Sequence, residues 1–247
     1  MPARPTRPLL EVCVDDPAGL AAAIAGGADR IELCAALAVS GLTPAPGLIA
    51  QAAESPIPVC AMIRPRPGGF IYSPEELDAA FHDIKAVKAA GLAGIVTGAT
   101  LPDGRLDLDT LARLRDAADG LELVIHRAFD LGPDLEESLE QAIELGVCRI
   151  LTAGGTRAAP EGIETLSRLA AQAGDRITIL AGGGVLPENA GRLLAAGVHE
   201  LHASCTSMVE DPYPATRINI AASRPQTLAK NVRALRDAME LATEQTQ

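Results

Sequence analysis

Short hydrophobic runs alternate with longer segments of helical periodicity along nearly the whole chain. The short runs are rich in Val, Ile, Leu and Ala and are typical of buried β-strands, whereas the longer segments have the apolar spacing of helices. The predicted strands are residues 9–14, 30–34, 58–63, 93–97, 122–126, 149–152, 178–181 and 200–203. The predicted helices are residues 17–26, 46–55, 74–90, 107–118, 133–145, 161–173, 187–195 and 227–243.

A recurring glycine marks the junction between a helix and the next strand, in the phrases GGADRIEL, AAGLAGIV, ELGVCRIL and AAGVHELH. Glycine accepts the left-handed conformation that commonly ends a helix. Repeated strand–helix units predict a parallel α/β sheet, and eight such units close most naturally into a (β/α)₈ TIM barrel. We expect a single domain over residues 9–247 after a disordered N-terminal arm over residues 1–8. An open doubly wound sheet is the alternative.

Composition adds limits on the core and the partners. Of the 247 residues 48% are hydrophobic but only 2% are aromatic, so Ala, Leu, Val and Ile must fill the core. The formal net charge of -11 disfavours nucleic acid and anionic membranes as partners. The N-terminal residues lack a signal-peptide apolar run, which predicts a cytoplasmic protein. Five cysteines, mostly in apolar runs, predict free thiols and no disulfide framework.

In a TIM barrel, active sites form where the strands end at their carboxyl side. That rule brings together one set of polar, thiol and glycine residues that end the predicted strands or follow them closely. The set is Cys13, Cys34, Arg64, Arg66, Thr97, His126, Arg127, Asp130, Thr152, Gly182, Gly183, Gly184, His202 and Ser204.

Strand parity places four sulfur-containing side chains inside the barrel. The branched aliphatic residues should face the helices, so the alternate positions Cys13, Cys34, Cys60 and Met62 should face inward. Thiolate and thioether are soft ligands that suit Cu(I). The alternative is that the cysteines are small core residues that only fill space.

The same parity points Glu11, Glu32 and His126 inward. A rim histidine can move protons near neutral pH, and buried glutamates can act as general acids or bases. The alternative is an internal ion pair of these glutamates with Arg64. Asp130 is expected to orient a neighbour or cap the turn.

A possible anion site combines the run Gly182–Gly184 with His202 and Ser204 at the end of the last strand. Backbone N–H groups of such paired loops grip phosphate in many barrels. Arg66, Arg127, Thr97 and Thr152 are further candidates for substrate binding from the same rim. The alternative is that the glycines only turn the chain.

Residues 9–204 contain, in this order, the motifs EVCVDD, GADRIELC, GLTP, MIRPR, FIYS, VTGA, HRAFD, LTAGG and GGGV. On these motifs the chain resembles the CutC family of copper-homeostasis proteins. The resemblance implies a cytosolic TIM-type barrel, a homo-oligomer, a role in copper tolerance, and Cys13 and Cys34 as Cu(I) ligands. The chain departs from the family pattern I-R-P-R-G-G-D-F with Pro67 and Gly69, so any role of the family's Asp in this loop is missing here.

Two functions therefore follow. The first is a copper-homeostasis protein whose partner is a Cu(I) ion held by Cys13 and Cys34. The second is an enzyme with lyase or isomerase proton-transfer chemistry, acting on a small phosphorylated or anionic metabolite. Arg64 and Arg66 would hold that metabolite, and His126 with Glu11 or Glu32 would move its protons. Residues 206–220 carry no interpretable motif.

Overall fold

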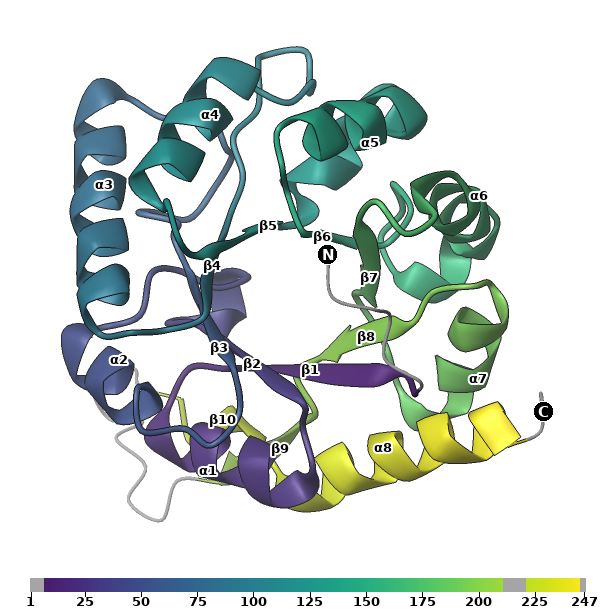
Figure 1. The fold of residues 1–247 in the computed structure, drawn as a ribbon. Helices are drawn as coiled ribbons and strands as arrows, with labels where there is room; N and C mark the ends of the chain where they lie inside the picture. Colours follow the sequence, from purple (N-terminus) through teal and green to yellow (C-terminus); the bar gives the residue numbers. More distant parts are fainter. Residues whose placement is uncertain (1–6, 211–220, 245–247) are drawn as a thin grey trace.

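A computed structural model of the chain contains a closed barrel of eight parallel strands, which confirms the predicted TIM barrel (Figure 1). The structure describes residues 7–210 and 221–244. Strand β1 pairs with both β2 and β8, and this closure rules out the open doubly wound sheet. The barrel strands are β1 (Leu9–Val14), β2 (Arg30–Leu33), β3 (Val59–Met62), β4 (Gly94–Thr97), β5 (Glu122–Ile125), β6 (Arg149–Thr152), β7 (Thr178–Gly182) and β8 (Glu200–Ala203).

Helices form a ring around the barrel (Figure 1). The α-helices are α1 (Pro17–Gly26), α2 (Pro46–Ala52), α3 (Pro74–Ala89), α4 (Leu108–Ala117), α5 (Leu135–Glu144), α6 (Ile163–Ala173), α7 (Pro187–Ala195) and α8 (Ala229–Glu244). Short 3-10 helices are η1 (Leu37–Val39), η2 (Arg127–Leu131) and η3 (Ala159–Glu161). In the described part of the chain, no helix has both the length and the hydropathy needed to cross a bilayer.

Local sequence explains several helix ends. Before α3, the Ser73 hydroxyl accepts a hydrogen bond from the Glu76 N–H at 3.3 Å, and the Glu76 carboxylate accepts one from the Ser73 N–H at 2.8 Å. This capping box satisfies N–H groups that have no partner within the helix, and Pro74 occupies the first turn, where no N–H is needed. Helix α1 ends at Gly27, whose φ of 92° suits glycine.

The predicted bounds of β1, β6, β8, α1 and α7 agree with the structure, and the other elements differ by a few residues at one or both ends. Helix α5 begins at Leu135 because the Asp134 carboxylate caps it, accepting hydrogen bonds from two N–H groups of its first turn. The predicted helix over 227–243 begins only at Ala229, since residue 227 belongs to a strand. Sequence analysis missed an antiparallel hairpin of β9 (Thr206–Glu210) and β10 (Ser223–Thr227). Residues 211–220 of the segment without a motif lie outside the described residues.

Two apolar clusters hold the barrel together. The larger lies between the strands and the surrounding helices and is built mostly from Ala, Leu, Val and Ile, as composition predicted. The smaller lies inside the barrel and contains Cys34, Cys60, Met62, Val96 and Val124. Each fully buried large aliphatic side chain contributes about 1.5–3 kcal/mol relative to exposure. Because Cys34, Cys60 and Met62 belong to the inner cluster, their predicted inward direction is confirmed.

Helix α8 closes the ring by packing against α1 and α7 (Figure 1). Gly26 permits the close approach, because a Cβ at this position would lie 2.5 Å from the Cβ of Val232. Arg236 of α8 donates to the Gly27 carbonyl at 2.9 Å and pairs with Asp29. Of the predicted N-terminal arm, residues 1–6 lie outside the described residues.

Arg7, within that predicted arm, pairs with Asp29 at 2.5 Å.

Candidate functional site

A cavity of about 720 Å³ opens at the carboxyl ends of the barrel strands, where sequence analysis placed the site. Loops after the strands, the β9–β10 hairpin and the first turns of α8 line it. Its lining includes these site candidates: Cys13, Glu32, Arg64, His126, Arg127, Gly183, Gly184, His202 and Ser204. The cavity therefore gathers residues from strands that are distant in sequence.

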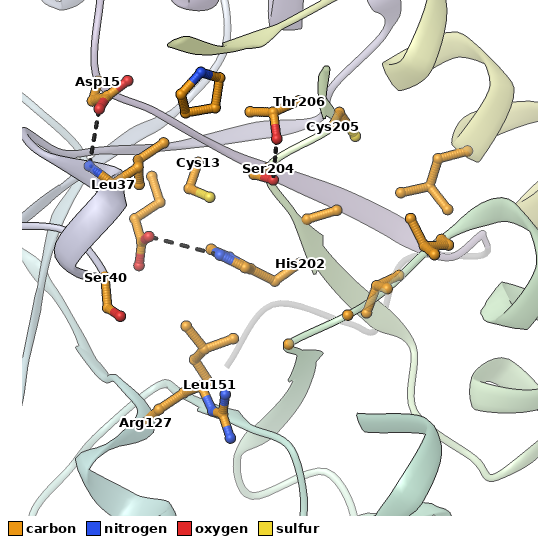
Figure 2. Close-up of a pocket in the computed structure, with 18 of the residues that line it drawn as sticks. Cys13, Asp15, Leu37, Ser40, Arg127, Leu151, His202, Ser204, Cys205 and Thr206 are labelled. Carbon is orange, nitrogen blue, oxygen red and sulfur yellow. Dashed lines mark hydrogen bonds and ion pairs between the residues drawn. The ribbon is translucent and has the colours of Figure 1, made fainter. Parts of the chain in front are cut away.

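One wall carries a cluster of Cys13 from β1, Glu32 from β2 and His202 from β8. One Cys13, one Glu32 and one His202 ligand atom lie within 4.8 Å of one another, and all three residues are buried. Figure 2 shows the Cys13 sulfur and the His202 ring turned into the same cavity. The Cys34 thiol donates to Glu32 Oε2 at 3.4 Å, so the two cysteines flank one carboxyl group.

The surroundings of His202 favour its protonated form. Its Nδ1 donates to Glu11 Oε1 at 2.8 Å, and its Nε2 lies 3.7 Å from Glu32 Oε2. Burial alone lowers the pKa of His202, but Cys13, Glu32 and Glu11 together raise it well above its usual value. Glu11 is the ionised partner of His202. Burial raises the pKa of Glu11, but Arg30 and His202 outweigh burial and bring this pKa well below the ordinary range.

The remaining acidic groups of this wall keep their protons more tightly. Burial raises the pKa of Glu32, with His202 opposing and Glu11 adding to the effect. Burial also raises the pKa of the Cys13 thiol, and His202 opposes it. Burial and the nearby Glu32 raise the pKa of Cys34 well above its usual value. Both thiols are therefore protonated at neutral pH.

Sequence analysis did not predict the buried ion pairs of Arg30 that lie beneath this wall. Arg30 donates from Nε to Glu11 Oε2 at 2.5 Å and also pairs with Glu200, with all three side chains inside the barrel. The signal was available, because Arg30 shares the strand parity of Glu32, and Glu200 shares that of His202. Glu11 is thus a positioning residue for His202.

The ion pair of Glu11 or Glu32 with Arg64, the alternative to a catalytic role, is not formed among the described residues. Arg64 instead donates to three backbone carbonyls, those of Val39 and Gly41 at 2.8 Å and that of Gly68 at 2.9 Å. The physical reason is that Arg30 already occupies the barrel interior beside Glu11.

His126 is placed at the rim but is not suited to proton transfer near neutral pH. Burial and the charge of Arg64 lower the pKa of His126 to about 3, so the ring is neutral at physiological pH. Its Nδ1 accepts a hydrogen bond from the Ala128 N–H at 3.1 Å. The ring packs against Phe70 with 4.7 Å between centroids.

Asp130 orients neighbouring groups, as expected from the sequence. Its carboxylate accepts hydrogen bonds from Arg127 Nε at 2.7 Å and from Thr152 Oγ1 at 2.5 Å. It also accepts from the N–H groups of Ala153 at 3.1 Å and Gly155 at 3.0 Å. This network fixes the loop after β6 against η2. Asp130 is therefore placed to hold the rim in shape.

Four candidates for substrate binding lie outside the cavity lining, namely Arg66, Thr97, Thr152 and Gly182. Arg66 pairs with Glu76 and donates to the Gly69 carbonyl at 2.8 Å, on the outer side of the third loop. Thr97 is buried and donates to the Ile63 carbonyl at 3.1 Å. The loop with Pro67 and Gly69 thus uses backbone carbonyls, including that of Gly68, to hold the two arginines.

The glycine run after β7 lies at the cavity edge. Gly183 and Gly184 have φ values of 94° and 71°, which favour glycine, and both line the cavity. Gly182 lies deeper, because a Cβ there would be 2.4 Å from Leu151 Cδ1 and 3.1 Å from the Cβ of His202. Close packing beside His202 thus explains why residue 182 is a glycine. The Ser204 hydroxyl lies 3.3 Å from Thr206 Oγ1 (Figure 2).

Comparisons with known proteins agree with this architecture. The model of the CutC family matches residues 8–207. A CutC family protein of Sinorhizobium medicae is 51% identical over 237 residues, covering 95% of this chain and 97% of its own length. One from Caulobacter vibrioides is 52% identical over 223 residues, covering 90% of this chain and 91% of its own.

A solved structure extends the likeness to three dimensions. The CutC protein of Streptococcus agalactiae, named for copper homeostasis, superposes with a TM-score of 0.76 at 34% identity. The match covers 80% of this chain and 98% of the other. With the matching family model, the close relatives and the shared barrel, this chain belongs to the CutC family.

Proposed function

We propose that this chain acts in copper homeostasis in the cytoplasm and binds Cu(I) as its cargo through Cys13 and Cys34. The observation that carries the proposal is the grouping around Glu32. The Cys34 sulfur lies 3.4 Å from Glu32 Oε2, and Cys13 offers its sulfur within 4.8 Å of Glu32 and His202. Two thiols therefore flank one carboxyl group: Cys13 lines the cavity, and Cys34 is fully buried outside its lining.

The donor set suits the chemistry of Cu(I). Thiolates are soft ligands and select Cu(I) over hard cations. Binding would remove the thiol protons of Cys13 and Cys34 and leave one net negative charge on a Cu(I)–dithiolate unit. The His202 imidazolium, hydrogen-bonded to Glu11 at 2.8 Å, is the neighbouring positive charge that would balance it.

The test is an anaerobic titration of the reduced protein with Cu(I) in competition with bicinchoninate. We expect one tightly bound equivalent in the wild-type protein and none after the double change Cys13→Ser and Cys34→Ser. Cys148→Ser is the matched control, since the Cys148 thiol donates to the Leu123 carbonyl at 3.1 Å and lies outside the cavity lining. Unchanged Cu(I) affinity in the double variant would refute the proposal.

A second candidate function is favoured by the size of the cavity. A volume of about 720 Å³ is far more than one ion needs and is in the range of small-molecule sites. The cavity wall holds Glu32, whose pKa is raised by burial, beside the His202 imidazolium. Such a pair suits proton transfer to or from a small anionic metabolite.

The enzyme proposal is tested by exchange of substrate protons with deuterated solvent, followed by NMR over a panel of small carboxylates and phosphate esters. We expect exchange with the wild-type protein and none with Glu32→Gln. Glu136→Gln, on the exposed Arg168–Glu136 pair, is the control that should retain exchange. Equal exchange rates with Glu32→Gln and wild type would remove Glu32 from this role.

A further inference from the structure

Arg64 is a buried cation without a carboxylate partner in residues 7–210 and 221–244. It is 5% exposed, and its two terminal nitrogens donate only to backbone carbonyls. Its Nε is buried and has no hydrogen-bond partner in the same residues. The other inward arginines differ, because Arg30 pairs with Glu11 and Arg149 pairs with Glu122. An uncompensated buried charge is costly unless a ligand completes it.

His126 supplies a second unused donor beside Arg64. Because its Nδ1 accepts the Ala128 N–H at 3.1 Å, the proton of the neutral ring must be on Nε2. Nε2 is buried and finds no partner among the described residues. The low pKa of His126, about 3 as a result of burial and Arg64, keeps this ring neutral and Nε2 a donor at physiological pH.

These two donors belong to one rigid wall. The Arg64 guanidinium lies 5.3 Å from the Phe70 ring centroid, and the His126 ring lies 4.7 Å from it. Gly98 packs behind the imidazole, because a Cβ there would lie 2.5 Å from His126 Cε1. Arg64, Phe70 and His126 all line the cavity. The donors are therefore held in place before any ligand arrives.

A third unsatisfied polar atom belongs to another residue of the same cavity lining. Of five buried side-chain atoms without partners among the described residues, three belong to cavity-lining residues: Glu32 Oε1, Arg64 Nε and His126 Nε2. Buried polar groups are normally hydrogen-bonded, so three exceptions around one cavity point to a ligand that satisfies them.

We propose that Arg64 Nε–H and His126 Nε2–H bind the carboxylate of a small hydroxy- or keto-acid whose other polar group reaches Glu32. The proposal rests on the second proposed function and names its substrate class. Two N–H donors match the two oxygens of one carboxylate, and the single charge of Arg64 balances a monoanion. A phosphate dianion would carry twice that charge into the same buried wall.

The test measures binding to copper-free protein by calorimetry, without turnover. The probes are lactate and pyruvate, with lactamide as the neutral isostere of lactate and inorganic phosphate as the competing anion. We expect lactate or pyruvate to bind at least about tenfold more tightly than lactamide or phosphate, as a charged hydrogen bond implies. Tighter binding of phosphate, or no binding of either carboxylate, would overturn the proposal.

One His126 variant and one arginine control distinguish loss of the donor from loss of the fold. His126→Asn keeps an acceptor near the Nδ1 position for the Ala128 N–H but removes the Nε2 donor, so carboxylate affinity should fall about tenfold. Arg176→Gln is the matched arginine control, since Arg176 pairs with Glu140 at the surface and lies outside this cavity lining, and it should bind as wild type does. Equal carboxylate affinity in a folded His126→Asn variant would overturn the assignment.

A second readout is independent of affinity. In protein labelled with ¹⁵N-histidine, His126 should show the neutral pattern with the proton on Nε2, and a carboxylate should shift that signal. A proton on Nδ1 would contradict the proposal. Carboxylate binding without deuterium exchange would leave this site standing and remove only the enzyme proposal. Deuterium exchange together with unaltered carboxylate affinity in His126→Asn would leave the enzyme proposal standing and remove the carboxylate site.

Discussion

Replacing Arg30 by methionine tests the buried charge network beneath the cavity. Arg30 lies between Glu11 and Glu200 inside the barrel, with its Nε 2.5 Å from Glu11 Oε2. Arg30→Met leaves both carboxylates buried without the guanidinium. Removing one partner of a buried ion pair costs about 3–5 kcal/mol, a large part of a typical unfolding free energy of about 5–15 kcal/mol.

The assay is urea unfolding followed by far-ultraviolet circular dichroism, because the chain has no Trp. With a urea dependence of about 2–3 kcal/mol per M, the unfolding midpoint should fall by about 1–2 M at pH 7. Arg168→Met, on the exposed Arg168–Glu136 pair, is the control and should cost less than about 1 kcal/mol.

The pH dependence has a definite sign. Arg30 and His202 hold the folded-state pKa of Glu11 below its unfolded value, although burial opposes them. Their contribution is therefore complete above the unfolded pKa of about 4.3 and is lost as the pH falls below it. The difference between wild type and Arg30→Met should be complete at pH 7 and shrink as the pH falls through 4. A loss below about 1 kcal/mol at pH 7, or one independent of pH, would refute this reasoning.

Three further predictions concern the rim and the proposed copper site. Gly98→Ala should lower the free energy of unfolding in urea by about 1–3 kcal/mol, because the added Cβ would lie 2.5 Å from His126 Cε1. An unchanged unfolding midpoint would show that the His126 ring has room to move. Asp130→Ala should lower the thermal unfolding temperature more than Asp130→Asn, which keeps one acceptor oxygen, and equal losses would contradict this. Since burial raises the pKa of both Cys13 and Cys34, Cu(I) binding should release two protons. Its affinity, measured by chelator competition, should then rise about a hundredfold per pH unit near neutrality, and a flat profile would exclude the dithiolate.

Strand parity accounts for most of what could be predicted from the sequence. It placed Glu11, Cys13 and Cys34 inside the barrel, and the repeated helix–strand junctions indicated its closure. Parity tells which face of a strand a residue lies on. It does not tell which residue of the adjacent strand lies beside it, because that depends on the register of the pairing. The β1–β8 register sets Glu11 opposite His202, and that pairing was not predicted.

The surroundings of Arg64 and His126 could not be predicted from the sequence. Sequence analysis started from the usual chemistry of the side chains, a guanidinium that pairs with carboxylates and an imidazole that titrates near neutrality. In the structure the carbonyls of Val39, Gly41 and Gly68 accept hydrogen bonds from Arg64, and the Ala128 N–H donates to the ring of His126. Loop carbonyls leave no pattern in the amino-acid sequence, so these contacts could only be found in three dimensions.

The pairing of the first barrel strand with the last has a consequence for synthesis of the protein. Glu11 and His202 are 191 positions apart, and they meet only when β8 joins β1. A ribosome delivers Cys13, Arg30 and Cys34 early, long before Glu200 and His202 emerge. A nascent chain halted after β7 would hold both thiols but neither the imidazolium nor the closed wall. The wall that joins Cys13 to His202 is therefore complete only in finished molecules.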